Sequence, residues 1–184
     1  MTPAYLDISL GMTYKSPKPK FPITVNMSPL ALNATFAESD LIRKDNGFAY
    51  GIEDPDKTSK YEGGSSVQID FDRTFGKTGY LRYRTMLYGF YGWISDIGQK
   101  NKISDYSKYL AAFEEWNAGD KDIKNKPRLP IHPIVRWTNT IDIKATKFIT
   151  TTLSFELYYN RAQNVDVQTK TLLSVGLTYT FKNK

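Results

Sequence analysis

The sequence predicts an all-β fold, an antiparallel transmembrane β-barrel to which this chain contributes about seven strands. Three observations predict it. Apolar and polar residues alternate with a period of two in seven segments. These segments run about 10–16 residues, whereas soluble strands average about 5–6 and membrane-barrel strands need about 9–11. Aromatic residues make up 14% of the 184 residues, and barrels place such side chains at both water–lipid boundaries.

The first two predicted strands are Tyr5–Lys15 and Phe21–Phe36, joined by a proline-rich turn at 16–20. Every second residue of the first strand, from Leu6 to Tyr14, is apolar or aromatic. In the second strand the apolar positions change parity after Pro29. Proline cannot donate to a strand ladder, so this change predicts a β-bulge at Pro29.

A polar loop is expected over Glu38–Gly64, followed by a third strand at Ser66–Phe75. A tight turn at Gly76–Gly79 leads to the fourth strand, Tyr80–Ile94. Both strands carry acidic or basic residues between apolar neighbours, which indicates one apolar and one polar face.

The long connection from Ser95 to His132 is expected to contain a short helix at Asp105–Asn117 that ends at Gly119. Apolar and aromatic side chains recur there at helical spacing and predict a packing face instead of a ligand site. These side chains are Tyr106, Tyr109, Leu110, Phe113 and Trp116.

The last three predicted strands are Ile134–Ala145, Phe148–Asn160 and Val165–Phe181. Connections are short after strands one, three and five and long after two and four, a rhythm typical of periplasmic turns and extracellular loops. With short turns in the periplasm, the first strand starts outside. Bacterial single-chain barrels have even strand numbers, so we expect residues 1–184 to be the C-terminal portion of a larger barrel, without a second domain. The missing strands would lie upstream, since no secretory signal is visible at Met1, or on another envelope subunit.

Composition argues against several classes of function. The net charge is +6, but the basic residues are scattered and form no stripe, so no nucleic-acid partner is expected. The chain has no Cys and one His, His132, so we expect no catalytic residues, no metal site and no cofactor. No apolar run approaches the ~20 residues that a membrane-spanning helix needs.

The polar faces predict a wet interior. In a membrane barrel the polar residues of each strand face the lumen and the apolar residues face lipid. If the third and fourth strands are joined by a loop at Gly76–Thr78, Asp72 stands across from Arg82 and Asp70 from Arg84, as a salt-bridge ladder. The predicted lumen-lining residues are Asp70, Asp72, Arg82, Arg84, Arg136, Asp142, Lys144 and Glu156.

Three segments carry a family resemblance: Thr2–Lys15, Asn26–Leu30 and Leu173–Phe181. Together they resemble a Bacteroidota family of outer-membrane barrels known only as a domain of unknown function. The resemblance covers this whole chain and the C-terminal part of the longer family members. It implies location in the outer membrane of a Gram-negative bacterium, in contact with outer-membrane lipid and lipopolysaccharide. It carries no catalytic residues.

The end of the chain resembles the C-terminal signal that barrel-assembly machinery recognises. Hydrophobic and aromatic residues alternate there, although Lys182–Lys184 follow the final Phe. The resemblance implies that this machinery is a partner of the last strand. The residues of the signal are Val175, Leu177, Tyr179 and Phe181.

Three functions follow from the sequence. The leading one is a non-enzymatic outer-membrane barrel that acts as a small pore or transport protein, or as a scaffold for cell-envelope partners. The first alternative is a soluble β-sandwich or β-barrel module that binds glycans or small ligands. The second alternative is an outer-membrane lipid-modifying enzyme that uses His132 near the outer rim, although no Ser or acid stands at a fixed spacing from it.

Overall fold

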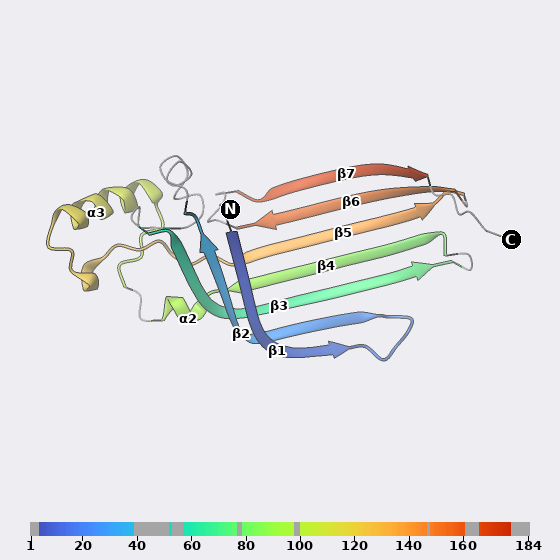
Figure 1. Cartoon of the computed structure of the whole chain (residues 1–184), viewed down its shortest axis with the longest axis horizontal. Helices are drawn as coiled ribbons and strands as arrows, with labels where there is room; N and C mark the ends of the chain where they lie inside the picture. Colours follow the sequence, from blue (N-terminus) through green and yellow to red (C-terminus); the bar gives the residue numbers. More distant parts are fainter. Residues whose placement is uncertain are drawn as a thin grey trace.

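The computed structural model describes residues 4–38, 52, 57–76, 79–97, 100–146, 148–160 and 166–177. Seven antiparallel strands form one meander sheet in which each strand pairs with its sequence neighbours (Figure 1). The strands are β1 (Ala4–Lys15), β2 (Ile23–Phe36), β3 (Ser59–Phe75), β4 (Leu81–Tyr91), β5 (Ile134–Lys144), β6 (Ile149–Tyr159) and β7 (Gln168–Leu177). The connection between β4 and β5 contains two short helices, α2 (Trp93–Asp96) and α3 (Tyr106–Ala118), and the 3-10 turn η2 (Ile123–Asn125).

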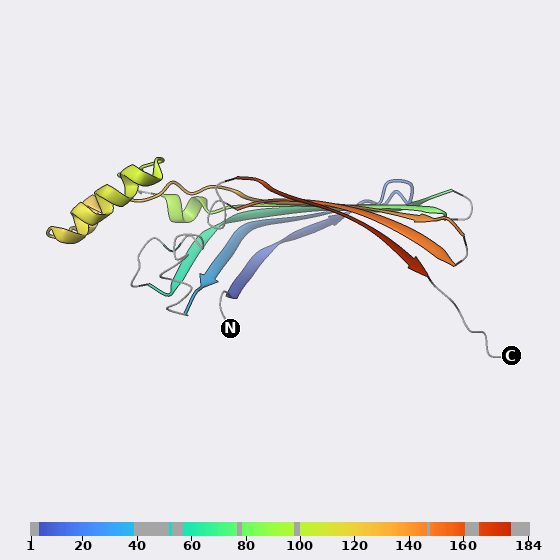
Figure 2. The ribbon, with the colours of Figure 1, turned by 90° about the horizontal axis from the view of Figure 1, so that it is seen from above.

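The sheet is open. β1 and β7 form its two edges, and they do not pair with each other within the described strands. Seen from above, the sheet is a single twisted layer, and α3 lies beyond one end of it without covering either face (Figure 2). The predicted antiparallel all-β class is therefore confirmed, whereas these seven strands do not close into a barrel.

Strand positions agree with the alternation pattern, but three bounds differ from the prediction by three residues or more: the start of β3, the end of β4, and the start of β7, which begins at Gln168 instead of Val165. β3 begins at Ser59 instead of Ser66, because residues 59–64, expected in the polar loop, pair with β2 from Phe36 to Ala31. β4 ends at Tyr91, and the next residues form α2. Residues 178–184, with the aromatic end of the proposed C-terminal signal, lie outside the described residues, as do 39–51 and 53–56 of the first long loop.

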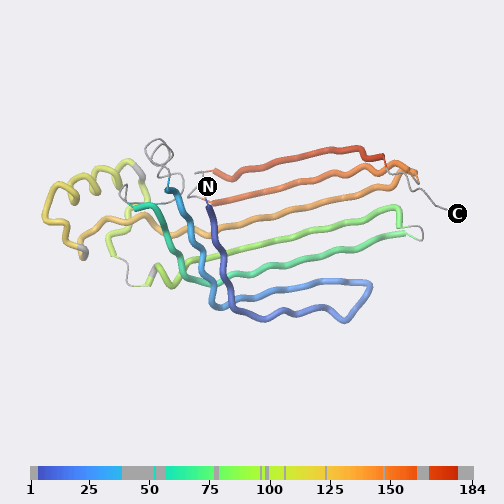
Figure 3. The backbone as a smooth tube through the Cα atoms, in the orientation of Figure 1, coloured from blue at the N-terminus to red at the C-terminus, as the bar shows by residue number. Residues whose placement is uncertain are grey.

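β1, β2 and β3 bend sharply, so that their ends nearest α2 run across the direction of the other strands (Figures 1 and 3). The bend coincides with a register shift that β2 shows against both of its neighbours, between Met27 and Leu30 opposite β1 and between Ser28 and Ala31 opposite β3. Both shifts contain Pro29 and confirm the predicted bulge, which is one extra residue in β2. An extra residue in one strand of a pair bends that strand and increases its twist, so this bulge accounts for the change of direction.

Glycines let the strands approach closely at this bend. A Cβ added to Gly64 would lie 1.9 Å from the Tyr91 carbonyl oxygen, and one added to Gly11 would lie 2.1 Å from the Met27 carbonyl oxygen. Any other residue would therefore push the neighbouring backbone away. Glycine kinks combined with bulges are a known way to curve a sheet.

Side chains also tie the bend together. The Ser65 hydroxyl donates to the Pro29 carbonyl oxygen at 2.9 Å, and the Trp93 indole N–H donates to the Ser65 hydroxyl at 2.7 Å. The Ser95 hydroxyl accepts the Gly63 backbone N–H at 2.8 Å. Backbone groups near the bend thus find partners outside the ladder, as polar backbone groups require. α2 holds the curved part of β3 in this way.

The predicted helix in the long connection is confirmed as α3, with Asp105 as its N-cap and Gly119 as its C-cap. Tyr109 and Phe113 are buried, and the Lys126 ammonium lies 5.2 Å from the centre of the Trp116 ring. The aromatic stripe is thus the packing face of a small lobe. None of the helices described here is both long enough and apolar enough to span a membrane.

Gly64→Ala should disrupt the bend, whereas Gly89→Ala should not. The added methyl group of the first variant meets backbone at 1.9 Å, while that of the second meets only a Val67 methyl group at 3.7 Å. We expect Gly64→Ala to lower the free energy of unfolding by about 1–3 kcal/mol, as overpacking does, and Gly89→Ala to change it by about 1 kcal/mol or less. Urea unfolding of both variants in detergent micelles measures the difference. Equal effects would show that the bend does not depend on close backbone approach.

Candidate functional site: a polar face and its hollow

Strand pairing places most polar side chains of the seven strands on one side of the sheet. The exceptions, in rows of the opposite side, include Arg73, Thr85, Asn139, Thr151 and Thr171. Directly paired residues of antiparallel strands point to the same face. One such row crosses the whole sheet, and it consists of Thr13, Asn26, Gln68, Tyr88, Arg136, Tyr158 and Gln168. A second row consists of Thr74, Arg82, Asp142, Thr152 and Ser174. We call this side the polar face.

All eight predicted site residues lie on the polar face. Each belongs to one of these rows or stands two positions along the same strand from a residue of these rows. They come from four adjacent strands, so the sheet brings them onto one continuous surface. On β3 and β4 they are Asp70, Asp72, Arg82 and Arg84, and on β5 and β6 they are Arg136, Asp142, Lys144 and Glu156.

The predicted register of the β3–β4 hairpin is wrong by two residues, which leaves each residue on its predicted face. Asp72 stands across from Arg84, not Arg82, and Asp70 stands across from Met86, not Arg84. The first pair of the hairpin is Phe75 with Leu81, so the connection is Gly76–Tyr80 and not Gly76–Thr78. Gly76 and Gly79 both have positive φ, and the Tyr80 carbonyl oxygen accepts the Lys144 backbone N–H at 2.7 Å. That contact with β5 holds Tyr80 outside the hairpin ladder.

A ladder of ions nevertheless forms, along the diagonals. The Arg82 guanidinium donates to the Asp72 carboxylate on β3 at 2.8 Å. The Arg84 guanidinium donates to the Asp142 carboxylate on the other neighbouring strand, β5, at 2.8 Å. Asp142 also accepts the Thr152 hydroxyl at 2.7 Å. The ladder therefore connects β3, β4, β5 and β6.

The remaining predicted residues extend this surface. Gln68 donates to the Asp70 carboxylate at 2.8 Å. Glu156 stands opposite Lys170 of β7, and Lys144 is exposed at the end of β5. The Arg136 guanidinium lies 6.0 Å from the centre of the Tyr158 ring, at the limit of a cation–π contact. Opposite charges thus alternate across the face.

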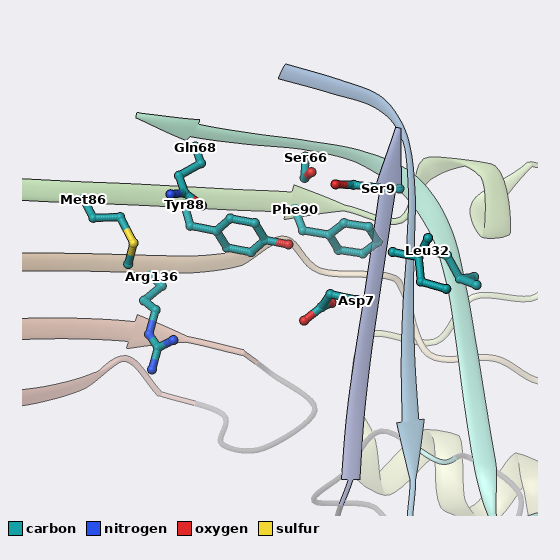
Figure 4. A pocket seen from close by; sticks show the side chains of 11 residues that line it. Asp7, Ser9, Leu32, Ser66, Gln68, Met86, Tyr88, Phe90 and Arg136 are labelled. Atoms are coloured by element: carbon teal, nitrogen blue, oxygen red, sulfur yellow. The ribbon is translucent and has the colours of Figure 1, made fainter. Parts of the chain in front are cut away.

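A hollow at the bent end of the polar face was not predicted from the sequence. It has a volume of about 310 Å³ and adjoins a second hollow of about 380 Å³, with which it shares Asp7, Tyr88 and Arg136. Figure 4 shows Tyr88 and Phe90 extending from β4 toward the crossing segments of β1 and β2. Alternation placed Asp7 on the polar side of its strand but gave no sign of the bend that carries it toward β4 and β5.

The opposite side of the sheet is apolar and uncovered, and we call it the apolar face. Trp137, Leu153 and Val175 are 40%, 41% and 66% exposed, so they are not buried together in a core. Other exposed residues of this face include Leu6, Ile8, Leu10, Met12, Met27, Leu30, Val67, Leu87, Ile143, Leu173 and Leu177.

His132 lies two residues before β5 begins. Within the described ranges, no group of three or more His, Asp or Glu side chains is arranged to hold a metal ion. A scan against protein-family models, a search of curated proteins and a search of solved structures each found no match to this chain.

Removing the charge of Asp142 should cost more stability than removing that of Asp72. The Asp142 side chain is 17% exposed and binds two partners, whereas the Asp72 side chain is 48% exposed and pairs with Arg82. We expect Asp142→Asn to lower the free energy of unfolding by about 1 kcal/mol and Asp72→Asn by about 0.5 kcal/mol or less, because water screens an exposed pair. Chemical denaturation with and without 1 M salt (a Debye length of about 3 Å) tests the order. A larger loss for Asp72→Asn would contradict it.

Proposed function

We propose that this chain forms part of the transmembrane wall of an outer-membrane β-barrel in a Gram-negative bacterium. In this proposal the apolar face contacts lipid and the polar face lines a wet interior. The barrel is non-enzymatic and acts as a small pore, with a scaffolding role for envelope partners as the second candidate.

The observation that carries the proposal is the uncovered apolar face, which extends over all seven strands. Burying a Leu or Val side chain is worth about 1.5–3 kcal/mol, and exposed apolar patches above a few hundred Å² are rare on soluble monomers. A soluble protein would pack this face against a second layer. α2 covers this face only at the bent part of β3, where Ile94 packs over Gly63, and α3 lies beyond the end of the sheet (Figure 2). Lipid hydrocarbon supplies the cover for the rest of the face.

Strand length supports the same proposal. β4, β5 and β6 each have 11 residues, which is about 36 Å of extended chain at about 3.3 Å per residue. A tilt of about 40° reduces this to about 28 Å, close to the apolar band of a barrel at about 25 Å. Aromatic residues stand at both ends, with Tyr91 and Tyr159 toward the long loops and Tyr14 toward a short turn.

The two open edges require partners. Unpaired N–H and C=O groups do not occur next to lipid, so in the membrane β1 and β7 must each pair with another strand. We propose that these strands come from an upstream region of the same protein or from another envelope subunit. The resemblance of the last strand to a C-terminal assembly signal adds the barrel-assembly machinery as a partner. Lipopolysaccharide would surround the end with the long loops.

Quenching of Trp137 fluorescence by labelled lipid tests the lipid contact of the apolar face, and quenching of Trp116 serves as the control. Trp137 lies on the apolar face, while Trp116 packs in the α3 lobe against Phe113 and donates to the Asp122 carbonyl oxygen. In liposomes with bromine on the acyl chains, a variant that keeps Trp137 alone (Trp93→Phe with Trp116→Phe) should lose most of its fluorescence. A variant that keeps Trp116 alone should be quenched little. Equal quenching of both, or a monodisperse detergent-free chain, would favour the soluble binding module.

A conductance measurement distinguishes the two candidate functions, a pore and a scaffold. Three of the four ions of the ladder remain about half exposed, with Arg82 at 47%, Asp72 at 48% and Arg84 at 44%, which favours an interior that contains water. The full-length protein in a planar bilayer should therefore give discrete current steps. A scaffold is favoured by the α3 lobe, which extends beyond the sheet (Figure 1), and it would give no steps above bilayer leak.

His132 provides the test of the enzyme alternative. We expect His132→Ala to leave any lipid hydrolase or acyltransferase activity of the purified protein at the level of the unsubstituted protein. Loss of such an activity would make the chain an enzyme.

A further inference from the structure

The hollow on the polar face has walls from two distant parts of the chain. The bent segments of β1 and β2 contribute Asp7 and Asn33, and the flat part of the sheet contributes Tyr88, Arg136 and Tyr158. The two adjoining volumes of about 310 and 380 Å³ fall within the range of small-molecule sites, about 300–1,000 Å³. Figure 4 shows Asp7 on the crossing strand, and Tyr88 and Arg136 on the strands behind it.

The charges of this hollow balance. Its charged lining residues are Asp7 and Arg136, which form no ion pair with each other in the described part of the chain. Asp7 accepts the Asn33 side-chain amide at 2.5 Å, and Arg136 faces the Tyr158 ring. Each ion is thus oriented by a neutral group and keeps hydrogen-bonding capacity for a ligand. With one charge of each sign, the hollow has no net preference for an anion or a cation.

Aromatic rings and amides complete the lining. Tyr5, Tyr88, Phe90 and Tyr158 supply ring faces and edges, and Asn33, Gln68 and Asn160 supply amides. Asn160 donates to the Tyr158 hydroxyl at 3.1 Å, which orients both groups. Aromatic surfaces suit the apolar C–H face of a pyranose ring, and carboxylate, guanidinium and amide groups suit hydroxyls that both donate and accept.

We infer that the hollow is a binding site for a neutral saccharide of one to two sugar rings. The inference rests on the proposed function, because it places the hollow in the wet interior, at the end of the wall that carries the long loops. There a saccharide contacts Asp7 on one wall of the hollow and Arg136 on the other, and it stacks on the Tyr88 ring between them.

Titration calorimetry of the full chain in detergent micelles tests this site with four probes: maltose, N,N′-diacetylchitobiose, glycylglycine and inorganic phosphate. At least one of the two neutral saccharides should bind, and the zwitterionic and anionic probes should not. Asp7→Asn and Arg136→Gln should each weaken saccharide binding about tenfold, the loss of about one charge-assisted hydrogen bond. Matched controls on the same face, Asp72→Asn and Lys144→Gln, should weaken it less than about twofold, since neither residue lines the hollow.

The inference is overturned if neither saccharide binds, if glycylglycine or phosphate binds more tightly, or if the controls weaken binding as much as the hollow variants. Unchanged circular dichroism of each variant excludes loss of the fold as the cause. Trp137 quenching by brominated lipid, measured on the same preparations, keeps the two proposals apart. A quenched Trp137 without saccharide binding contradicts the site alone, and saccharide binding with an unquenched Trp137 contradicts the membrane wall alone.

Discussion

The register of strand pairing is the constraint on which the rest of this structure depends. Six consecutive antiparallel pairings keep like residues in the same rows, so that apolar side chains of all seven strands share one face. A slip of one residue in any pairing would turn a strand's apolar residues to the opposite face. In the proposed barrel such a slip would place charged residues such as Arg84 in lipid, at a cost of about 2–4 kcal/mol per Arg near the bilayer midplane.

One bulge in β2 preserves this division where β1 and β2 bend. After the bulge at Pro29, the apolar residues Leu30 and Leu32 remain on the same face as Val25, although their sequence parity has changed. The bend itself needs Gly11 and Gly64, where strands come too close for a side chain. The bulge keeps the apolar face continuous, and the bulge and the two glycines together carry Asp7 to the hollow. The proposed transmembrane wall and the candidate binding site therefore both depend on this bend.

Much of this fold could be predicted from the alternation of residues. Period two located all seven strands, the parity change located the bulge, and Asp105 with Gly119 bounded the helix. Alternation could not reveal the strand at residues 59–64, because paired glycines and charged residues there indicate a loop. It also fixes which face a residue occupies without fixing the register, so Asp72 was placed across from Arg82 instead of Arg84, although the expected ion pair of Asp72 with Arg82 does form, along a diagonal. The hollow depends on the direction of the bend, and no local pattern encodes that direction.

The chain has no Cys, so single cysteines can carry spin labels along β6 without removing a native thiol. Labels at positions 153, 154, 155 and 156 of the protein in lipid bilayers measure access to oxygen, which dissolves in lipid, and to a nickel chelate, which stays in water. We expect a period of two, with oxygen access high at Leu153 and Phe155 and nickel access high at Ser154 and Glu156. Equal access at neighbouring positions, or high nickel access at Leu153 and Phe155, would contradict a sheet with lipid on one side and water on the other.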